Sequence, residues 1–238
     1  MVHEFVPHAR RRDDKTEAVL DHAMKLIAHE GLEALTLARV AQSLGLVTTA
    51  LYRYFPSKDA LLAALQRRAV TTIHAHFRET RARLATPRSA PEVAALVPLL
   101  GVARAYVALP QTHADAFRLV SLLLGDPRRL VPDDEAVRTA PLVAGFLSEV
   151  AELFAHAQEQ RALDRDDALT RTVVLWATLH GLTQLEKLRR LAPHARDATA
   201  LCDEATGALL RGFGADPAHL SRARRALDRL ASRGTPEG

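Results

Sequence analysis

The sequence has a single cysteine, Cys202, among its 238 residues. One thiol excludes an intrachain disulfide and a zinc site built from several cysteines, and it suits a reducing, cytoplasmic compartment. Strand patterns are also missing, because runs of β-branched residues are rare and apolar residues recur at spacings of three and four. Together with a composition rich in alanine, leucine and arginine, this spacing predicts an all-α protein.

Long hydrophobic runs are scarce as well. The most apolar stretch late in the chain, residues 173–182, is far shorter than the roughly 20 residues that span a bilayer. The first residues carry charges at Glu4, at 10–12 and at 13–14, and they lack the apolar core of a secretory signal. We therefore expect a soluble, cytoplasmic protein with no membrane partner.

Patterns of catalytic and metal sites are not found in the sequence. No histidine pair stands at i, i+3 or i+4 with a carboxylate on the same face, and there is no glycine-rich phosphate loop. His180 with Tyr106 or Glu186 could be imagined as an acid–base pair, but a histidine packed in the core is the simpler interpretation. We expect no catalytic residues, no cofactor and no metal, and hence not an enzyme.

Neither sign of charge dominates, since the chain has 32 lysines and arginines and 28 acidic residues, which gives a net charge of +4. This balance permits nucleic-acid binding without requiring it, so the positions of the basic residues are more informative. Arg10, Arg11 and Arg12 precede the first predicted helix. Arg39, Arg53 and Lys58 lie in a segment, 36–58, that contains no acidic residue.

Apolar side chains are plentiful, at 48% of the residues, which is enough for a sizeable core. Hydrophobic periodicity, caps and breaks predict about nine or ten helices. They are expected at residues 14–30, in a pair between 36 and 55, and at 57–84, 91–109, 112–124, 140–161, 165–191, 195–213 and 217–232. We place the domain boundary after Pro56, with an N-terminal domain of residues 1–56 and a larger helical domain of residues 57–238.

The segment 36–58, TLARVAQSLGLVTTALYRYFPSK, predicts a helix, a tight turn and a second helix. Thr36 is expected to be the N-cap of the first helix, whose buried stripe is Leu37, Val40, Ala41 and Leu44. Gly45 follows where the chain needs a left-handed conformation, and Leu46 is expected to turn inward. The second helix is expected to run from Val47 or Thr48 to Phe55, because Pro56 disfavours helix at the residue before it.

This second helix has the size and polarity to enter a DNA major groove. Thr48 and Thr49 offer hydroxyls and methyls to base edges, Arg53 offers a guanidinium to guanine or phosphate, and Tyr52 suits either. Thr36, Tyr54 and Lys58 are placed to meet the phosphate backbone. The three arginines 10–12 would either reach into the minor groove as a flexible arm or remain surface charge. In a competing interpretation, Tyr52 and Tyr54 are half-buried aromatics of a small bundle.

Residues 16–65 resemble the TetR-type transcriptional regulators. The shared frame is a first helix closed by Gly31, followed by T-x-x-x-V-A, G-L-V, L-Y-x-Y-F and S-K-D-x-L-L. The resemblance implies a repressor that dimerises through its C-terminal body, binds a palindromic operator and releases it when a small ligand enters that body. Val47 departs from the pattern, because it stands where the family often has a capping serine. Valine cannot cap, so either Thr48 or water is expected to cap the second helix.

Residues 175–188, LWATLHGLTQLEKL, resemble a W-x-x-x-H-G-L pattern of one group of TetR-type C-terminal domains. The resemblance implies that Trp176, His180 and Gly181 lie in a largely buried helix near the dimer interface or a ligand pocket. It also implies a homodimer interface formed by helices 165–191 and 195–213. A pocket would be apolar with few polar anchors, and its candidate lining residues, each of which could equally be packed core, are Tyr106, Phe117, Phe146, Phe154, Trp176 and His180.

We therefore expect a homodimeric, ligand-responsive regulator that binds an inverted repeat of DNA as a repressor. Its expected partners are operator DNA, a second copy of itself and a small, apolar ligand. Two other classes remain open at this point, a DNA-binding protein without a small-molecule effector and a helical enzyme that carries the motif.

Overall fold

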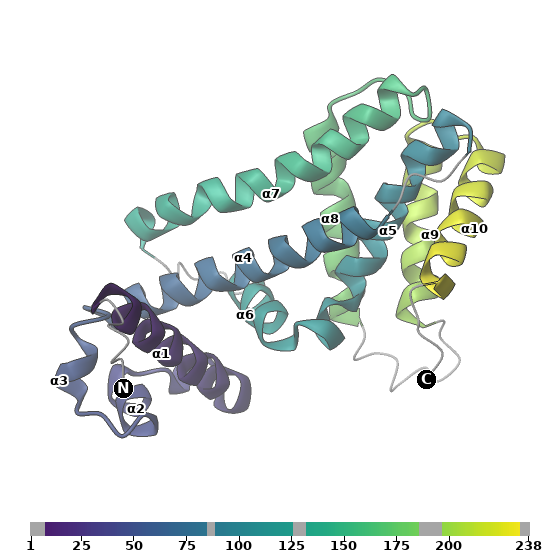
Figure 1. Ribbon diagram of the computed structural model, residues 1–238. Helices are drawn as coiled ribbons and strands as arrows, with labels where there is room; N and C mark the ends of the chain where they lie inside the picture. Colours follow the sequence, from purple (N-terminus) through teal and green to yellow (C-terminus); the bar gives the residue numbers. More distant parts are fainter. Residues whose placement is uncertain (1–7, 85–88, 126–131, 186–196, 234–238) are drawn as a thin grey trace, which may run out of the picture. The chain divides into compact units, whose positions relative to one another are not determined.

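The computed structural model describes residues 8–84, 89–125, 132–185 and 197–233, and every element within them is a helix (Figure 1). The elements are α1 (His8–Glu30), the short 3-10 helix η1 (Leu32–Ala34), α2 (Leu37–Ser43), α3 (Thr48–Leu51), α4 (Lys58–Arg83), α5 (Pro91–Thr112), α6 (Ala114–Gly125), α7 (Asp133–Glu159), α8 (Ala168–Gln184), α9 (Ala198–Gly212) and α10 (Pro217–Arg233). The predicted all-α fold is confirmed.

The chain divides into two compact units. The first unit comprises residues 1–72 and 113–142, and the second comprises residues 73–112 and 143–238. Helices α4 and α7 each contribute one part to the first unit and one part to the second. The domain boundary placed after Pro56 stays a prediction.

The first unit has a core formed by the apolar faces of its helices. Helix α1 contacts α2, η1 and α6, and α2 contacts α3. The inner face predicted for α1 is buried at Val19, Ala23 and Ile27, whereas Leu26 is only partly buried. The other core side chains of this unit include Leu37, Val40, Ala41, Leu51, Phe55, Leu61 and Leu65. Leu44, the last residue of the stripe predicted on α2, remains partly exposed.

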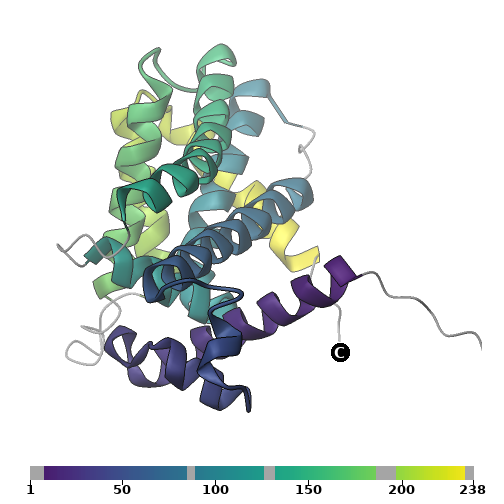
Figure 2. The same cartoon turned by 90° about the vertical axis from the view of Figure 1, so that its left-hand side faces the viewer.

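The second unit is built around α5, which packs against α8, α9 and α10 (Figures 1 and 2). Within the described residues, α5 is the one helix long and apolar enough to cross a membrane, but 67% of its apolar window is buried inside the molecule. Helix α5 is therefore a core helix. It is also a longer apolar stretch than residues 173–182, contrary to expectation.

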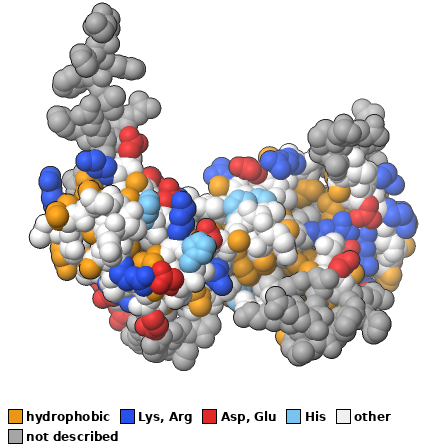
Figure 3. All heavy atoms as spheres, turned by 90° about the horizontal axis from the view of Figure 1, so that it is seen from below, with side chains coloured by type: hydrophobic (Ala, Val, Ile, Leu, Met, Phe, Trp, Pro, Cys, Tyr) orange, Lys and Arg blue, Asp and Glu red, His pale blue; other side chains and the backbone are white. Residues whose placement is uncertain are grey.

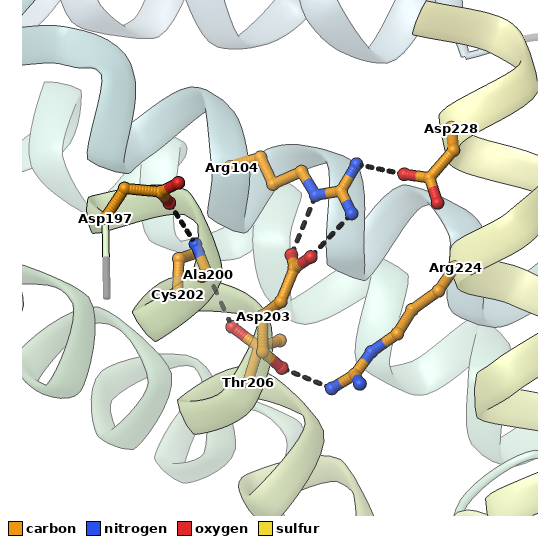
Figure 4. Close-up of polar contacts among 8 residues, drawn as sticks. All are labelled: Arg104, Asp197, Ala200, Cys202, Asp203, Thr206, Arg224 and Asp228. Atoms are coloured by element: carbon orange, nitrogen blue, oxygen red, sulfur yellow. Dashed lines mark hydrogen bonds and ion pairs between the residues drawn. The ribbon is translucent and has the colours of Figure 1, made fainter. Parts of the chain in front are cut away.

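A cluster of charged side chains joins α5 to α9 and α10 (Figure 4). Arg104 of α5 donates to both carboxylate oxygens of Asp203 on α9, at 2.7 and 2.6 Å, and to Asp228 on α10 at 2.7 Å. The hydrogen bond to Asp203 is the main reason why the pKa of Arg104 lies above its ordinary value. Arg224 of α10 also donates to the backbone carbonyl of Asp203. These directional contacts set the register of α9 and α10 on the apolar surface of α5.

Two helices begin earlier than predicted. Helix α1 begins at His8, so residues 10–12 lie within its first turns. The contact of their side chains with DNA stays a prediction. Arginine and alanine are good helix formers, which lets the helix extend outward from its buried part. Helix α7 begins at Asp133 and not at 140, because its three acidic first-turn residues favour the positive end of the helix dipole. Of the segment between the helices predicted at 112–124 and 140–161, residues 126–131 lie outside the described residues.

Candidate nucleic-acid interface and internal cavity

The turn between α2 and α3 forms largely as the sequence predicts. Thr36 caps α2, because its hydroxyl accepts a hydrogen bond of 3.2 Å from the backbone N–H of Arg39. Gly45 has a φ of +65°, the left-handed conformation in which glycine avoids a steric penalty. The backbone N–H of Leu46 donates to the carbonyl of Ala41 at 2.9 Å and closes the turn. The Leu46 side chain does not turn inward as expected, since it is 41% exposed.

Helix α3 is shorter than predicted. Its regular part ends at Leu51 and not at Phe55. Turns follow, in which the backbone N–H groups of Tyr54 and Phe55 both donate hydrogen bonds to the carbonyl of Leu51. Val47 occupies the N-cap position without a side-chain cap, and Thr48 lies inside the helix, so Thr48 does not take over the cap. An uncapped start and the following Pro56 leave few residues that can stay helical.

The residues predicted to contact DNA lie along α2, α3 and the start of α4, within the first unit. Thr36, Thr49, Tyr52 and Arg53 are exposed, and Tyr52 reaches 54% exposure. Thr48, Tyr54 and Lys58 are partly buried. We call these seven residues the recognition surface. The competing interpretation of Tyr52 as a half-buried aromatic does not hold, whereas Tyr54 does have that intermediate burial.

Two hydrophobic residues beside this surface were not predicted to take part in it. Val47 is 70% exposed and Leu46 is 41% exposed, although both are large apolar side chains. Exposed methyl groups at the start of a helix that enters a major groove would suit the methyl group of thymine. The sequence signal was the valine itself, since an apolar residue at an uncapped N-terminus has no local role.

The basic residues of the segment 36–58 differ in their partners. Arg39 donates from Nη2 to both carboxylate oxygens of Glu30 on α1, each at 2.7 Å, so its charge is already balanced. In the described part of the chain, Arg53 and Lys58 have no such acidic partner. Across the face seen in Figure 3, basic, acidic and hydrophobic side chains are interspersed. Arg53 and Lys58 are the cations of the recognition surface.

The recognition surface is held by contacts within the first unit. Ser57 caps α4, because its hydroxyl accepts from the backbone N–H of Ala60 at 3.0 Å, an interaction that contributes about 1 kcal/mol. Arg68 of α4 pairs with Asp21 of α1. Arg118 of α6 donates to the backbone carbonyl of Ala28 near the end of α1. The side chains of residues 10–12 lie outside the described residues.

The second unit contains a small cavity between α4, α5, α7 and α8. It is partly open and has a volume of about 20 Å³, which is room for one water molecule. Its lining residues are Phe77, Val102, Ala103, Tyr106, Phe146, Leu147, Val150, Thr172, Leu175, Trp176 and Leu179.

Three of the predicted lining residues, Tyr106, Phe146 and Trp176, do line this cavity, and the other three do not. Phe154 is fully buried and its ring meets Phe213 edge-on, with centroids 6.1 Å apart. Phe117 is buried in α6, which belongs to the first unit. His180 lies behind the lining, where its Nδ1 is 3.0 Å from the hydroxyl of Tyr106.

A chain of hydrogen bonds joins the lining residues Trp176 and Tyr106 to His180, and we call these three side chains the polar end of the cavity. The indole N–H of Trp176 donates to the Tyr106 hydroxyl at 3.0 Å, and this hydroxyl pairs with His180 Nδ1 at the same distance. Burial raises the pKa of Tyr106 to about 12, and desolvation lowers the pKa of His180. All three side chains are therefore uncharged at neutral pH.

Helix α8 presents an apolar face that the described residues leave exposed. Leu169, Val173, Val174 and Leu185 are 38–51% exposed, and Ala177 and Gly181 are exposed on the same helix. A Cβ atom added at Gly181 would meet nothing within 4 Å. The resemblance implied that this helix is largely buried near a dimer interface or a pocket. Within one chain, the helix around Gly181 is exposed on this face. An exposed apolar stripe of this length is typical of a protein interface.

Comparison with protein families gives two matches that together include well over half of the chain. Residues 19–65 match the bacterial regulatory proteins of the tetR family, and residues 99–209 match the tetracyclin repressor-like C-terminal domain. The chain is 43% identical over 60 residues to the tetracycline repressor protein class C of Escherichia coli. That match spans 25% of this chain and 27% of the repressor.

Solved structures share the fold across most of the chain. A Rhodococcus protein of unknown function has a TM-score of 0.68 and 20% identity, with 83% of this chain and 94% of that chain covered. The regulator FadR of Bacillus subtilis, in complex with stearoyl-CoA, has a TM-score of 0.61, 15% identity and coverages of 82% and 98%. RolR in complex with resorcinol has a TM-score of 0.54, 19% identity and coverages of 97% and 99%. With both halves matched and the fold shared, the chain belongs to the TetR family of bacterial transcriptional regulators.

Proposed function

We propose that this protein is a homodimeric repressor that binds an inverted-repeat operator through its recognition surface and leaves the operator when a small ligand enters the cavity. The observation that carries the proposal is the exposure of Thr49, Tyr52 and Arg53 beside a capped α2 and a left-handed Gly45. These are the side chains that a helix-turn-helix needs to present to DNA.

The roles within the recognition surface follow from chemistry and exposure. Arg53 has five N–H donors that can fork onto guanine, and the exposed threonine and tyrosine side chains can reach base edges. Thr36, Tyr54 and Lys58 would bind phosphates and set the register, which carries no sequence information. The arginines at 10–12 would add phosphate contacts from the first turns of α1.

The dimer is proposed to form through α8 and α9. The apolar face of α8 has the composition of an interface core, and two copies of it can meet around a two-fold axis. A two-fold dimer presents two recognition surfaces, and these match the symmetry of an inverted repeat. Residues 1–56 would then act as the DNA-binding domain and residues 57–238 as the ligand-binding and dimerisation domain.

The cavity is the proposed effector site. Stearoyl-CoA and resorcinol are bound by proteins of similar fold, and the cavity here lies between helices α4 and α7, which also contribute to the first unit. A ligand that binds more tightly to the conformation that cannot bind DNA would shift the population of the protein towards that conformation. TetR-family proteins are regulators, and we propose no catalytic activity for this one. Its proposed location is the cytoplasm.

The test of the proposed function is a selection of binding sites from random DNA duplexes by the full-length protein. We expect recovery of an inverted repeat whose half-site centres lie about 34–36 Å apart or at a multiple of that distance. Enrichment of sequences without an inverted repeat, or of none, would contradict the proposal.

A further inference from the structure

The cavity of the second unit has an apolar body and one polar end. Among the residues that line it none carries a formal charge, and Trp176 and Tyr106 form the polar end with His180 behind them. We propose that the cavity binds a small, uncharged and largely apolar molecule with a hydroxyl group, and that this hydroxyl joins the hydrogen bonds of Trp176, Tyr106 and His180. The inference rests on the proposed function and names the class of its ligand.

The lining excludes an ionised ligand group. A carboxylate or phosphate moved into this cavity would lose its water shell without meeting a cation, which is a large cost in an apolar environment. Tyr106 keeps its proton and His180 is held in its uncharged form by burial, so neither of these two groups supplies a charge to a ligand. An acyl chain that ends in a carboxylate, and a coenzyme A ester with its phosphates in the cavity, are therefore both disfavoured.

A hydroxyl fits the polar end because it donates and accepts. Trp176 Nε1 can only donate, so a group that takes the place of the Tyr106 hydroxyl on this nitrogen must accept. The proton between Tyr106 and His180 Nδ1 belongs to either partner, depending on the tautomer of the imidazole. A hydroxyl that enters this pair keeps both partners hydrogen-bonded in either tautomer. A methyl ether only accepts, and a hydrocarbon does neither.

The cavity has to widen for such a ligand. It now holds about one water molecule, and the rings of Phe77 and Phe146 meet edge-on across it with centroids 5.0 Å apart. Phe146 and Leu147 are partly exposed, so they have solvent to move into, whereas the α5 residues of the lining are buried. Entry of a ring would displace these side chains and change the surroundings of Trp176, the one tryptophan of the chain.

Fluorescence titration of Trp176 in the full-length protein tests the ligand class with three matched probes. These are para-propylphenol, para-propylanisole and para-propylbenzoate, of which the phenol is neutral at pH 7 and the benzoate is ionised. We expect the phenol to bind saturably. The Kd of the anisole should be about tenfold higher, because one neutral hydrogen bond is lost, and the benzoate should bind more weakly still. Equal or tighter binding of the benzoate or the anisole, or no saturable response to the phenol, would overturn the proposal.

Variants identify the residues that recognise the hydroxyl. In Tyr106→Phe the preference for the phenol over the anisole should fall to about threefold or less, because one partner of the ligand hydroxyl is lost. Ser148→Ala removes a hydroxyl from an exposed site on α7 and should leave the preference unchanged. Trp176→Phe should also weaken the preference, and binding to this variant is measured by the rise in Tm that each probe causes. This second variant keeps the test possible if Tyr106→Phe does not fold. An unchanged preference in both cavity variants would contradict the proposed contacts.

These titrations contain no DNA. A failed preference among the probes would leave binding to an inverted repeat intact, and a failed selection of DNA sites would leave the probe result intact. The ligand class and the proposed function can therefore fail separately.

Discussion

Arg39, Arg53 and Lys58 carry the same charge within one short segment, but they differ in what surrounds them. Glu30 balances Arg39 through two hydrogen bonds of 2.7 Å. Arg53 is exposed and follows α3, where a side chain can reach base edges. Lys58 is partly buried at the first position of α4, where an ammonium group can bind a phosphate. On this ground we propose different tasks for the three residues.

The substitutions Arg53→Ala and Lys58→Ala should affect DNA binding in different ways. Arg53→Ala should cost about 1–3 kcal/mol for the preferred duplex and relax the sequence preference at one position. Lys58→Ala should weaken binding to all duplexes alike and reduce the slope of log K against log salt by about one unit. Fluorescence anisotropy with matched and mismatched duplexes at several salt concentrations measures both effects.

Arg222→Ala serves as the control for charge, because Arg222 is exposed on α10 in the second unit. This variant should retain the affinity and the salt slope of the parent protein. If Arg53→Ala and Lys58→Ala also behave like the parent, the recognition surface is misplaced.

Local signals explain which residues could be predicted. Thr36 as a cap and Gly45 in the left-handed conformation depend on their own neighbours in the chain, and both predictions are confirmed. The pairing of Arg39 with Glu30 joins two helices, so no local pattern contains it. Leu46 was expected to be buried, but backbone hydrogen bonds close the turn and the side chain is not needed there.

Helix α8 shows how an element can serve two surfaces. One face supplies Thr172, Leu175, Trp176 and Leu179 to the cavity. The other face exposes Leu169, Val173, Val174 and Leu185, which is unusual for a helix whose partners are all within one chain. The near-continuous hydrophobic character that the sequence shows at 173–182 is consistent with a helix that lines the cavity on one face and, as proposed, contacts a second copy with the other.

A charge placed on the exposed face of α8 should disrupt the dimer without unfolding the chain. Val173 is 42% exposed, so Val173→Glu costs little in the isolated chain but buries an unpaired charge in the dimer, at several kcal/mol. Light scattering coupled to size-exclusion chromatography should show a monomer, and circular dichroism should show the parental helix content.

The matched control is Val143→Glu on α7, at a valine that is 38% exposed. This variant should remain a dimer. A dimeric Val173→Glu protein would place the interface on another surface.

Hydrophobic periodicity predicts the presence of every long helix, because each buries one face and repeats it over several turns. It predicts the ends less well. Helix α3 ends at Leu51, before the predicted Phe55, and α7 extends past Pro141 towards its acidic first turn. Of the predicted cavity residues, only those whose helices face one another in the folded chain line the cavity, and this depends on packing between distant segments.

At the scale of the whole molecule, the chain joins a unit that presents the recognition surface to a unit that contains the cavity. Helices α4 and α7 each belong to both units, so a change at Phe77 or Phe146 acts on helices that also contain part of the first unit. In the proposed dimer, two copies of the chain would present two recognition surfaces to one DNA duplex. Binding through both at once gives a much higher affinity than binding through either alone.

The most direct measurement compares the selected inverted repeat with a duplex that keeps only one of its half-sites. Affinity is measured by anisotropy, and the number of chains on each duplex is measured by analytical ultracentrifugation. The account predicts an even number of chains on the inverted repeat and an affinity for the single half-site that is weaker by at least about 10²-fold. A single chain bound to the inverted repeat, or equal affinity for the two duplexes, would contradict it.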